Sequence, residues 1–600
     1  MRPTRSRAGK RWRYGTAAVA ILTLGAATAC TSSGSPSSSS TASGSSASAS
    51  ASSGGTLSFP RNETVYTSGT AGGPPTIWNP LDTGNFATGA QGLIYEPLFL
   101  YDPIKGQYDP WLATGSVESG WQGTKYVINV RSGVKWSDGT PMTAADVAFS
   151  INLAMKNAAD PYNANVASVA SATASGNTVT VTFKNNQPAY TEFTDYLWKA
   201  PVLPQHIWSK VPASQLATWA DTNPVGTGPM TVDTTTQTEV AYQTKPAGQW
   251  WANSALGLSF KFKYLVDVVN GTNSQELGQL TTGQIDWDNN YLPGINALAQ
   301  AQGGTGGYTL KFFQSESQHY MMSGNTVWLE PNTTKAPMNN VDFRKALAYA
   351  LNPSAIAQQV YGGIATPANP TGLLPTLQSQ FVTPNDSQLT PLEATYNPSK
   401  AEALLKQSTY KGQTLTLEAP AGWSDWNQAQ TVIAQELEAV GIKINVIQPT
   451  ANQRTADLDS GKYDLALDNN AGLDTTPWSY FQRIYQLPIQ SQQNAQMNWE
   501  RFSSPSDWAT VQQLATTAPS DTATQNADYL KLEKDFLTQQ PEIPLWYNGV
   551  WFQGNTQYWT DYPSASSSAD ANVPAMWGGY IGAMTTVPAL AQLTPVKQSS

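Results

Sequence analysis

The sequence predicts a mixed α/β protein. From Thr56 onward, stretches with strand-like alternation and stretches with helical spacing follow one another without an internal repeat. The composition fits a folded body, because 40% of the 600 residues are hydrophobic and 21 are tryptophan. A chain of this length has room for about three or more structural units.

The first half of the body carries clear local signals. Residues 93–101 are apolar and aromatic, and residues 125–131 alternate as a half-buried strand does. Residues 137–141, Ser-Asp-Gly-Thr-Pro, have the composition of a turn. A helix is expected to begin after Thr143, which serves as its N-cap, with Asp146 completing an acidic variant of the capping box.

The second half alternates helices and strands. The expected helices are 341–351, 397–405, 428–440 and 529–537, and the expected strands are 442–447 and 543–547. Asn397 and Pro398 fit the N-cap and first position of their helix. Gly441 fits the end of the helix before it, so βαβ units are expected.

Charge and residue counts exclude several functions. Residues 1–29 contain six bases and no acid, and the rest of the chain has 27 bases against 42 acids. So acidic a body is a poor binder of nucleic acid and of anionic head groups. Cys30 is the single cysteine, and there are only two histidines, so we expect no disulfide, no metal site and no cofactor.

The N-terminus has the layout of an export signal. Residues 1–29 have a basic start, an apolar run and small residues before Cys30, which predicts a signal peptide. The 16 uncharged residues 14–29 fall short of the ~20 that a membrane span needs. Residues 24–30 resemble a bacterial lipobox, which implies a lipid on Cys30. The Ser-, Ala- and Gly-rich residues 30–55 then predict a flexible tether of about 25–30 Å.

Motifs along the body resemble the family 5 solute-binding proteins of ABC importers, the dipeptide, oligopeptide and nickel-binding group. The strongest match is residues 130–147, which contain "SDGTP" and "ADV". Further matches are "YEPL" at 95–98 and the segments 203–207, 226–229, 283–286, 343–350, 361–363, 463–465 and 541–545. The resemblance covers nearly all of residues 56–555.

This resemblance implies a fold, a location and partners. The fold is the type II periplasmic-binding-protein fold of cluster C, with two hinged lobes and an extra domain. Lobe 1 would be 56–95, 225–310 and 546–600, the extra domain 96–224, and lobe 2 311–545. The implied function is that of a monomeric lipoprotein on the extracellular face of the cytoplasmic membrane. It would capture a solute between its lobes and deliver it to permease subunits.

For an oligopeptide ligand, the resemblance implies a carboxylate that holds the peptide amino terminus. Asp474 is the best counterpart, three residues before Pro477, although the family pattern more often spaces this Asp by four, where Leu473 stands. Asp468 is the second candidate. Both could instead cap or turn the chain. An oligopeptide is the preferred ligand, because it is the commonest ligand class in the family that the chain resembles.

An oligosaccharide is the alternative, since some family members bind cello-oligosaccharides. Indole rings offer flat apolar faces, and neighbouring amides bond to hydroxyls. The candidate residues, expected in loops, are Trp287, Trp423, Trp426 and Trp478, with Asn289 and Asn469 as polar neighbours. No catalytic motif of the serine hydrolase, phosphate-loop or zinc-protease kind occurs, so we expect a binding protein and not an enzyme.

Overall fold

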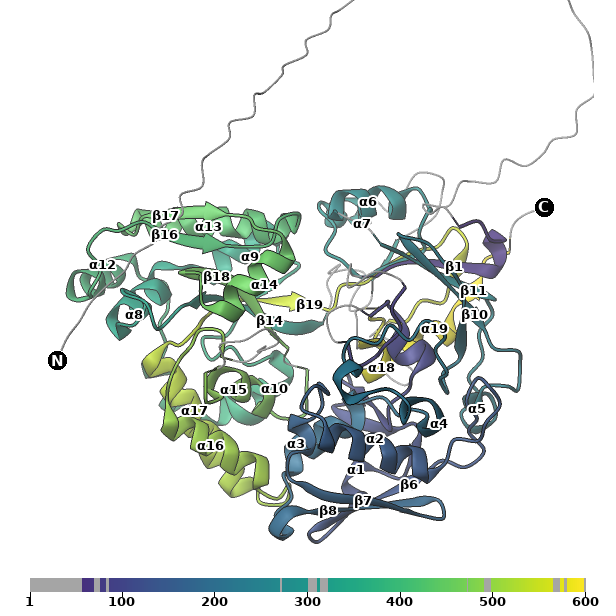
Figure 1. The fold of residues 1–600 in the computed structure, drawn as a ribbon. Coiled ribbons are helices and arrows are strands. Elements are labelled where there is room, and N and C mark those ends of the chain that lie inside the picture. The colour runs from purple at the N-terminus through teal and green to yellow at the C-terminus, as the bar shows by residue number, and fades with distance from the viewer. Residues whose placement is uncertain are drawn as a thin grey trace, which may run out of the picture. The chain divides into compact units, whose positions relative to one another are not determined.

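The computed structural model describes most of the chain after the predicted tether (Figure 1). The described residues are 57–69, 76–82, 86–269, 272–300, 310–312, 322–471, 473–489, 498–564, 572–576 and 580–597. All belong to one compact unit, residues 51–600. The predicted signal peptide, Cys30 and the tether lie outside the described residues. No helix among the described segments is long and apolar enough to cross a membrane.

A seven-stranded sheet collects strands from three separated stretches of chain. Its order is β13-β20-β12-β1-β11-β10-β9. The strands are β1 (Thr64–Gly69), β9 (Met230–Thr235), β10 (Glu239–Thr244), β11 (Tyr264–Val269), β12 (Trp287–Asp288), β13 (Leu310–Phe312) and β20 (Gln553–Asn555). β1 runs parallel to β11 and β12, which are joined through helix α6 (Asn273–Thr281). This connection is a βα crossover of the predicted kind.

A six-stranded sheet lies in the second half of the chain, in the order β15-β19-β14-β18-β16-β17. The strands are β14 (Ser323–Pro331), β15 (Thr366–Pro367), β16 (Leu415–Glu418), β17 (Ile444–Ile447), β18 (Leu465–Ala471) and β19 (Ile543–Gly549). All nine residues of β14 are buried, as a central strand covered on both faces requires. The limit at 545/546 that the resemblance implies falls inside β19.

Helices connect and cover this second sheet. They are α8 (Val341–Ala350), α9 (Pro353–Tyr361), α12 (Pro398–Gln407), α13 (Ser424–Ala439), α14 (Ala451–Ser460), α15 (Trp478–Tyr485), α16 (Pro505–Thr516) and α17 (Thr522–Gln539). β16, α13 and β17 form a parallel βαβ unit. The side chain of Asn397 caps α12, and Pro398 is its first residue, both as predicted.

The third sheet, five short strands, lies within residues 96–224. Its members are β4 (Ala113–Thr114), β5 (Trp121–Gln122), β6 (Lys125–Val130), β7 (Val169–Ser175) and β8 (Thr178–Phe183). Helix α2 (Ala144–Lys156) begins with the predicted capping box, in which the Thr143 amide donates to Asp146 Oδ2 over 2.8 Å. Hairpin β2–β3 (Phe99–Asp102 and Gln107–Pro110) and helix α3 (Tyr190–Lys199) complete this part.

Two local predictions were wrong. Residues 419–427 were expected as a loop, but α13 begins at Ser424, four residues before the predicted start at 428. Asp425 lies in its first turn, where a carboxylate stabilises the helix N-terminus. The tryptophans expected in loops lie in regular elements as well, with Trp287 in β12, Trp426 in α13 and Trp478 at the start of α15.

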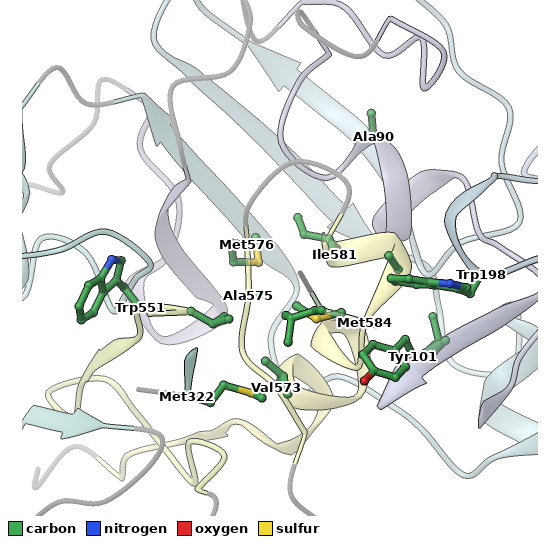
Figure 2. Close-up of a cluster of buried hydrophobic side chains, with 14 of the residues drawn as sticks. Ala90, Tyr101, Trp198, Met322, Trp551, Val573, Ala575, Met576, Ile581 and Met584 are labelled. Carbon is green, nitrogen blue, oxygen red and sulfur yellow. The ribbon is translucent and has the colours of Figure 1, made fainter. Parts of the chain in front are cut away.

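The C-terminal segment contributes to the core. Figure 2 shows Val573, Met576 and Met584 among side chains from distant parts of the chain, including Tyr101 and Trp198. These side chains are buried, and Met584 bridges to Tyr101 in the backbone. The C-terminal segment also contains helices α18 (Tyr580–Ala583) and α19 (Thr586–Gln592). Its last strand, β22 (Thr594–Pro595), pairs with β21 (Trp559–Thr560). The C-terminal segment thereby links strand β21 to hairpin β2–β3.

Candidate functional site

A cavity of about 250 Å³ lies between the six-stranded sheet with its helix α13 and the connections α6 and 289–291 of the seven-stranded sheet. Its described lining is four aromatic, five amide and one carboxyl side chain: Tyr291, Trp423, Trp426, Trp551, Asn273, Asn290, Asn325, Asn469, Asn548 and Asp425. They come from α6, the loop after β12, β14, α13, β18, β19 and the segment after β19. No lysine, arginine or histidine is among these described lining residues.

Trp423 and Trp426 form one aromatic wall. Trp423, at the N-cap of α13, is 42% exposed, whereas Trp426 is 2% exposed. The rings meet edge to face, with centroids 4.9 Å apart and planes at 79°. Because Trp426 also packs edge-on against Trp546 of β19, it is held by the core and in turn holds the exposed ring.

Tyr291 and Trp551 form a second aromatic wall. Their ring centroids are 5.5 Å apart, and Trp551 stacks on Tyr361 of α9 at an interplanar angle of 16°. The Tyr291 hydroxyl donates to the carbonyl of Val360 over 3.1 Å, which fixes that ring in place. Each wall is thus braced by α9 or β19 rather than by its own loop.

The amide side chains supply hydrogen-bonding groups. Asn325 Oδ1 is buried and has no hydrogen-bond partner among the described residues. Asn548 Oδ1 accepts from the indole N–H of Trp551 over 3.2 Å, so its amide nitrogen is turned to other groups. Uncharged donors and acceptors of this kind suit a ligand that carries hydroxyl or amide groups.

Asp425 is the one carboxyl in the described lining. Its Oδ2 accepts from the Tyr361 hydroxyl over 3.0 Å. Burial raises the pKa of Asp425 to about 6, although the bond from Tyr361 lowers it in part. Asp425 is therefore held as a hydrogen-bond acceptor and stays partly protonated in mild acid.

Three of the eight predicted ligand residues line this cavity, namely Trp423, Trp426 and Asn469. Trp287, Asn289, Asp468, Asp474 and Trp478 are not among its described lining residues. Contact between any of these eight residues and a solute stays a prediction. Their surroundings show what each side chain does in the fold.

Asn289 and Trp287 hold the second aromatic wall in place through the backbone of Trp551. Asn289 Nδ2 donates to the carbonyls of Trp551 and Pro574 over 2.5 and 2.6 Å. Its Oδ1 accepts from the Trp287 indole N–H over 2.5 Å and from the Met576 amide over 3.0 Å. This buried amide joins the backbone of a cavity residue to the C-terminal segment.

Asp468 and Trp478 are engaged in lobe 2 as the resemblance defines it. Asp468 pairs with Arg454 of α14 over 2.6 Å and with Arg483 of α15 over 2.5 Å, and all three side chains are largely buried. The Trp478 indole N–H donates to the carbonyl of Val511 over 3.1 Å. Two guanidinium groups already balance the Asp468 charge, which leaves it poorly placed to bind a ligand cation.

Asp474 contacts residues of hairpin β2–β3. Its Oδ1 accepts from the Tyr108 hydroxyl over 3.0 Å and from the Thr475 amide over 2.6 Å, and its carbonyl accepts from Tyr101 over 3.0 Å. Burial raises the pKa of Asp474 to about 8, with the nearby Asp195 carboxyl adding to the rise. A largely protonated acid is a weak partner for a peptide ammonium group.

Sequence reasoning missed Asn273, Asn290, Tyr291, Asn325, Asp425, Asn548 and Trp551. Two signals could have found part of this set. Asn290 and Tyr291 directly follow Asn289, and Trp551 lies three residues beyond Asn548 just after a buried strand. Polar and aromatic residues immediately after strands commonly form ligand sites in α/β sheets.

The sequence profile of the bacterial extracellular solute-binding proteins, family 5 middle, matches residues 107–491, more than half of the chain. The chain belongs to this family. The family resemblance predicted from the motifs is confirmed, and so is the fold class, since the structural neighbours are type II periplasmic binding proteins. Homologues of this family 5 protein are substrate-binding proteins of ABC transporters and not enzymes, as predicted.

Three known proteins show which members of family 5 this chain is similar to. One is the periplasmic oligopeptide-binding protein of an oligopeptide ABC transporter from Thermotoga maritima, whose crystal structure contains mannohexaose. It is 31% identical to this chain with a TM-score of 0.82, and the match covers 90% of this chain and 100% of the Thermotoga protein. Glutathione-binding protein GsiB of Salmonella typhi is 28% identical over 347 residues, 56% of this chain and 60% of GsiB. The match therefore spans less than two thirds of that relative. AppA of Bacillus subtilis, bound to a nonapeptide, shares the fold with a TM-score of 0.69 at 16% identity.

Proposed function

We propose that this chain is the solute receptor of an ABC importer, which captures its solute in the cavity around Trp423 and Trp426 and delivers it to membrane permease subunits. Membership of family 5 supports the receptor role. The cavity supports the place of capture, because its lining comes from the six-stranded sheet with α13 and from α6 and the loop after β12, which connect strands of the seven-stranded sheet. Hinged closure of two such parts buries a ligand between them.

The proposed solute is an uncharged oligosaccharide. The observation that carries this proposal is the lining of four aromatic rings and five amides, with one carboxyl that already accepts from Tyr361. Aromatic rings stack on the apolar faces of sugars, and amides both donate to and accept from hydroxyls. The 31% identical relative bound to mannohexaose supports the same class. Trp423, Trp426 and Asn469 are the predicted residues to which we assign ligand contact.

An oligopeptide is the second candidate. The names of several relatives favour it, as does the position of Asp474 before Pro477. Against it, the Asp474 carboxyl already bonds to Tyr108 and Thr475. The described lining also offers a peptide carboxylate no cationic side chain.

Thermal unfolding of the full-length chain tests the solute class. One panel contains β-linked manno- and cello-oligosaccharides, and the other contains peptides of two to five residues. A ligand at 100 times its Kd adds about 2.7 kcal/mol to the free energy of unfolding. We expect a raised midpoint with an oligosaccharide. A raised midpoint with peptides alone would overturn the proposed solute class and favour the second candidate.

Attachment to the outer face of the cytoplasmic membrane completes the proposal. The basic and apolar residues 1–29 and the single cysteine at position 30 support export and lipidation. The uncharged residues 31–55, 14 of them serine, support a tether that presents the receptor to its permease. We propose that the receptor works as a monomer.

A further inference from the structure

Two buried carboxyl groups face each other between separate parts of the fold. Asp474 follows β18 in the part built on the six-stranded sheet, and Asp195 lies in α3 of the 96–224 part. The two residues are 3% and 4% exposed, and the Asp195 carboxyl is near enough to Asp474 to raise its pKa. Helices α3 and α16 lie side by side at the same junction (Figure 1).

The hydrogen bonds identify which carboxyl carries a proton. Asp195 accepts from the Trp198 indole N–H over 3.3 Å and from Lys199 Nζ over 2.6 Å, so its charge is balanced. Asp474 Oδ1 accepts from Tyr108 and Thr475, whereas its buried Oδ2 has no donor among the described residues. Two ionised carboxylates cannot bond to each other, because both only accept. Because a buried carboxylate oxygen without a donor is disfavoured, Asp474 Oδ2 is the oxygen that a proton would occupy.

The groups around the pair complete its electrostatics. Tyr101 of β2 donates to the Asp474 carbonyl and lies beside Trp198 in Figure 2, with ring centroids 5.2 Å apart. Tyr529 of α17 also lies near Asp474. Glu192, one turn before Asp195, has its pKa raised to about 7 by burial and then by the Asp195 charge. Lys199 lowers the pKa of Asp474, but burial outweighs it.

We propose that Asp474 and Asp195 form a proton-dependent latch, which holds the six-stranded-sheet part against hairpin β2–β3 and α3 and so favours retention of the solute in acid. In the joined state, Asp474 donates its proton to Asp195. When the parts separate, Asp474 enters water and loses that proton at neutral pH. The consequence for the solute rests on the proposed function, whereas the latch itself does not.

The direction of the pH effect follows from linkage. In water an Asp has a pKa near 3.9, whereas burial in the joined state raises the pKa of Asp474 to about 8. The joined state is fully favoured below the lower pKa, where both states are protonated. Between the two pKa values, each unit of rising pH lowers the ratio of joined to separated molecules by up to tenfold. Above the higher pKa the ratio no longer changes.

Distance measurement without solute tests the latch. The full chain carries Cys30→Ser and two spin labels, at Ser175→Cys in β7 and Gln407→Cys in α12, both exposed positions. Pulsed electron resonance then gives the fractions of joined and separated molecules from pH 5.5 to 8.5. Because no solute is added, a wrong solute class leaves this result unaffected.

We expect the joined fraction to fall as the pH rises in the parent chain. Asp474→Asn should abolish this dependence and stay joined at pH 8.5, since the amide can donate to Asp195 and accept from Tyr108. Glu192→Gln and the exposed control Asp386→Asn should keep the dependence. A parent distance distribution that does not change with pH, or the same slope in Asp474→Asn, would overturn the proposal.

Infrared spectroscopy gives a second readout that needs no movement. The difference spectrum of the parent chain minus Asp474→Asn at pH 6 should contain the C=O stretch of one protonated carboxylic acid. The same difference for Asp386→Asn, at an exposed position, is the control and should lack this stretch. A carboxylate band at Asp474 would show an ionised group and would overturn the latch.

Discussion

The exposed ring of Trp423 stands edge-on against the buried ring of Trp426, with 4.9 Å between their centroids. The Trp426 ring belongs to the core and the Trp423 ring to the cavity opening, although the two residues are only three positions apart at the start of α13. A side chain held in this way loses little freedom on binding, which favours ligand affinity. The pair therefore separates two roles that substitution can distinguish.

Trp423→Ala should weaken solute binding without unfolding the protein. Loss of a central aromatic contact costs at least about 1.4 kcal/mol, or tenfold in Kd. The free energy of unfolding should change by less than about 1 kcal/mol, since the ring is 42% exposed. Titration calorimetry with the oligosaccharide that raises the melting midpoint measures the first effect. Tyr396→Ala, which removes a similarly exposed aromatic side chain outside the cavity, should leave binding unchanged.

Trp426→Ala should instead destabilise the fold. The side chain is 2% exposed and packs against Trp423 and Trp546, so its removal leaves a cavity that costs about 3–5 kcal/mol. Urea unfolding measures the loss. Equal stability of the Trp426→Ala and Trp423→Ala proteins would contradict the division of roles between the two rings.

Asn289→Ala should lower stability and solute affinity together. The substitution leaves the buried carbonyls of Trp551 and Pro574 without their donor, at a cost of about 2–4 kcal/mol. Displacement of Trp551 should then raise Kd, although Asn289 does not line the cavity. Unfolding and titration of the same preparation check both effects. A raised Kd with unchanged stability would point to direct ligand contact instead.

A rise in pH from mildly acidic to about 8 should destabilise the part built on the six-stranded sheet. Its interior contains one cluster of four carboxyl groups and two guanidinium groups: Glu330, Asp468, Glu500, Glu542, Arg454 and Arg483. Burial raises the pKa of Glu330 to about 8, with the Asp468 charge adding to it. An acid with a raised pKa stabilises the fold fully below its ordinary pKa of about 4.3, and that stability is lost as the pH rises through 8.

Urea unfolding at several pH values checks this dependence. Between pH 5 and 8, one such carboxyl contributes a slope of up to about 1.4 kcal/mol per pH unit. Glu330→Gln should reduce the slope of the free energy of unfolding against pH by part of this amount. Glu402→Gln, at an exposed position of α12, should leave it unchanged. Superimposable curves for the parent and Glu330→Gln would contradict the buried-acid explanation.

Cys30→Ser should release the protein from membranes. If the single cysteine carries the lipid anchor, cells expressing the variant should have the protein in the soluble extracytoplasmic fraction. Fractionation and the mass of the N-terminal peptide measure both the location and the lipid. Retention of Cys30→Ser in the membrane fraction would contradict lipid anchoring at this residue.

Local signals predicted the elements that are fixed locally. The alternation of residues 125–131 and the caps of α2 and α12 depend on neighbours in sequence, and all three appear in the structure. The start of α13 was missed because Gly422 and the flanking tryptophans indicate a loop, whereas the helix gains its first turn from packing of Trp426 on β19.

The candidate site was predictable only in part. Tryptophan and asparagine content indicated the chemistry, and three of the predicted residues line the cavity. Asn325 and Trp551 reach it through sheet packing over long sequence separations, which no local pattern shows. Asp468 is easily seen as a carboxylate, but its two guanidinium partners belong to α14 and α15 and only the fold brings them together.

Calorimetric titration of the full-length chain with mannohexaose, and separately with a tetrapeptide, tests whether the cavity takes a neutral sugar. We expect saturable heat with the sugar, a Kd raised at least tenfold by Trp423→Ala, and no saturable heat with the peptide. Saturable heat with the peptide alone, weakened by Asp474→Asn and unaffected by Trp423→Ala, would contradict this account and place the ligand at Asp474.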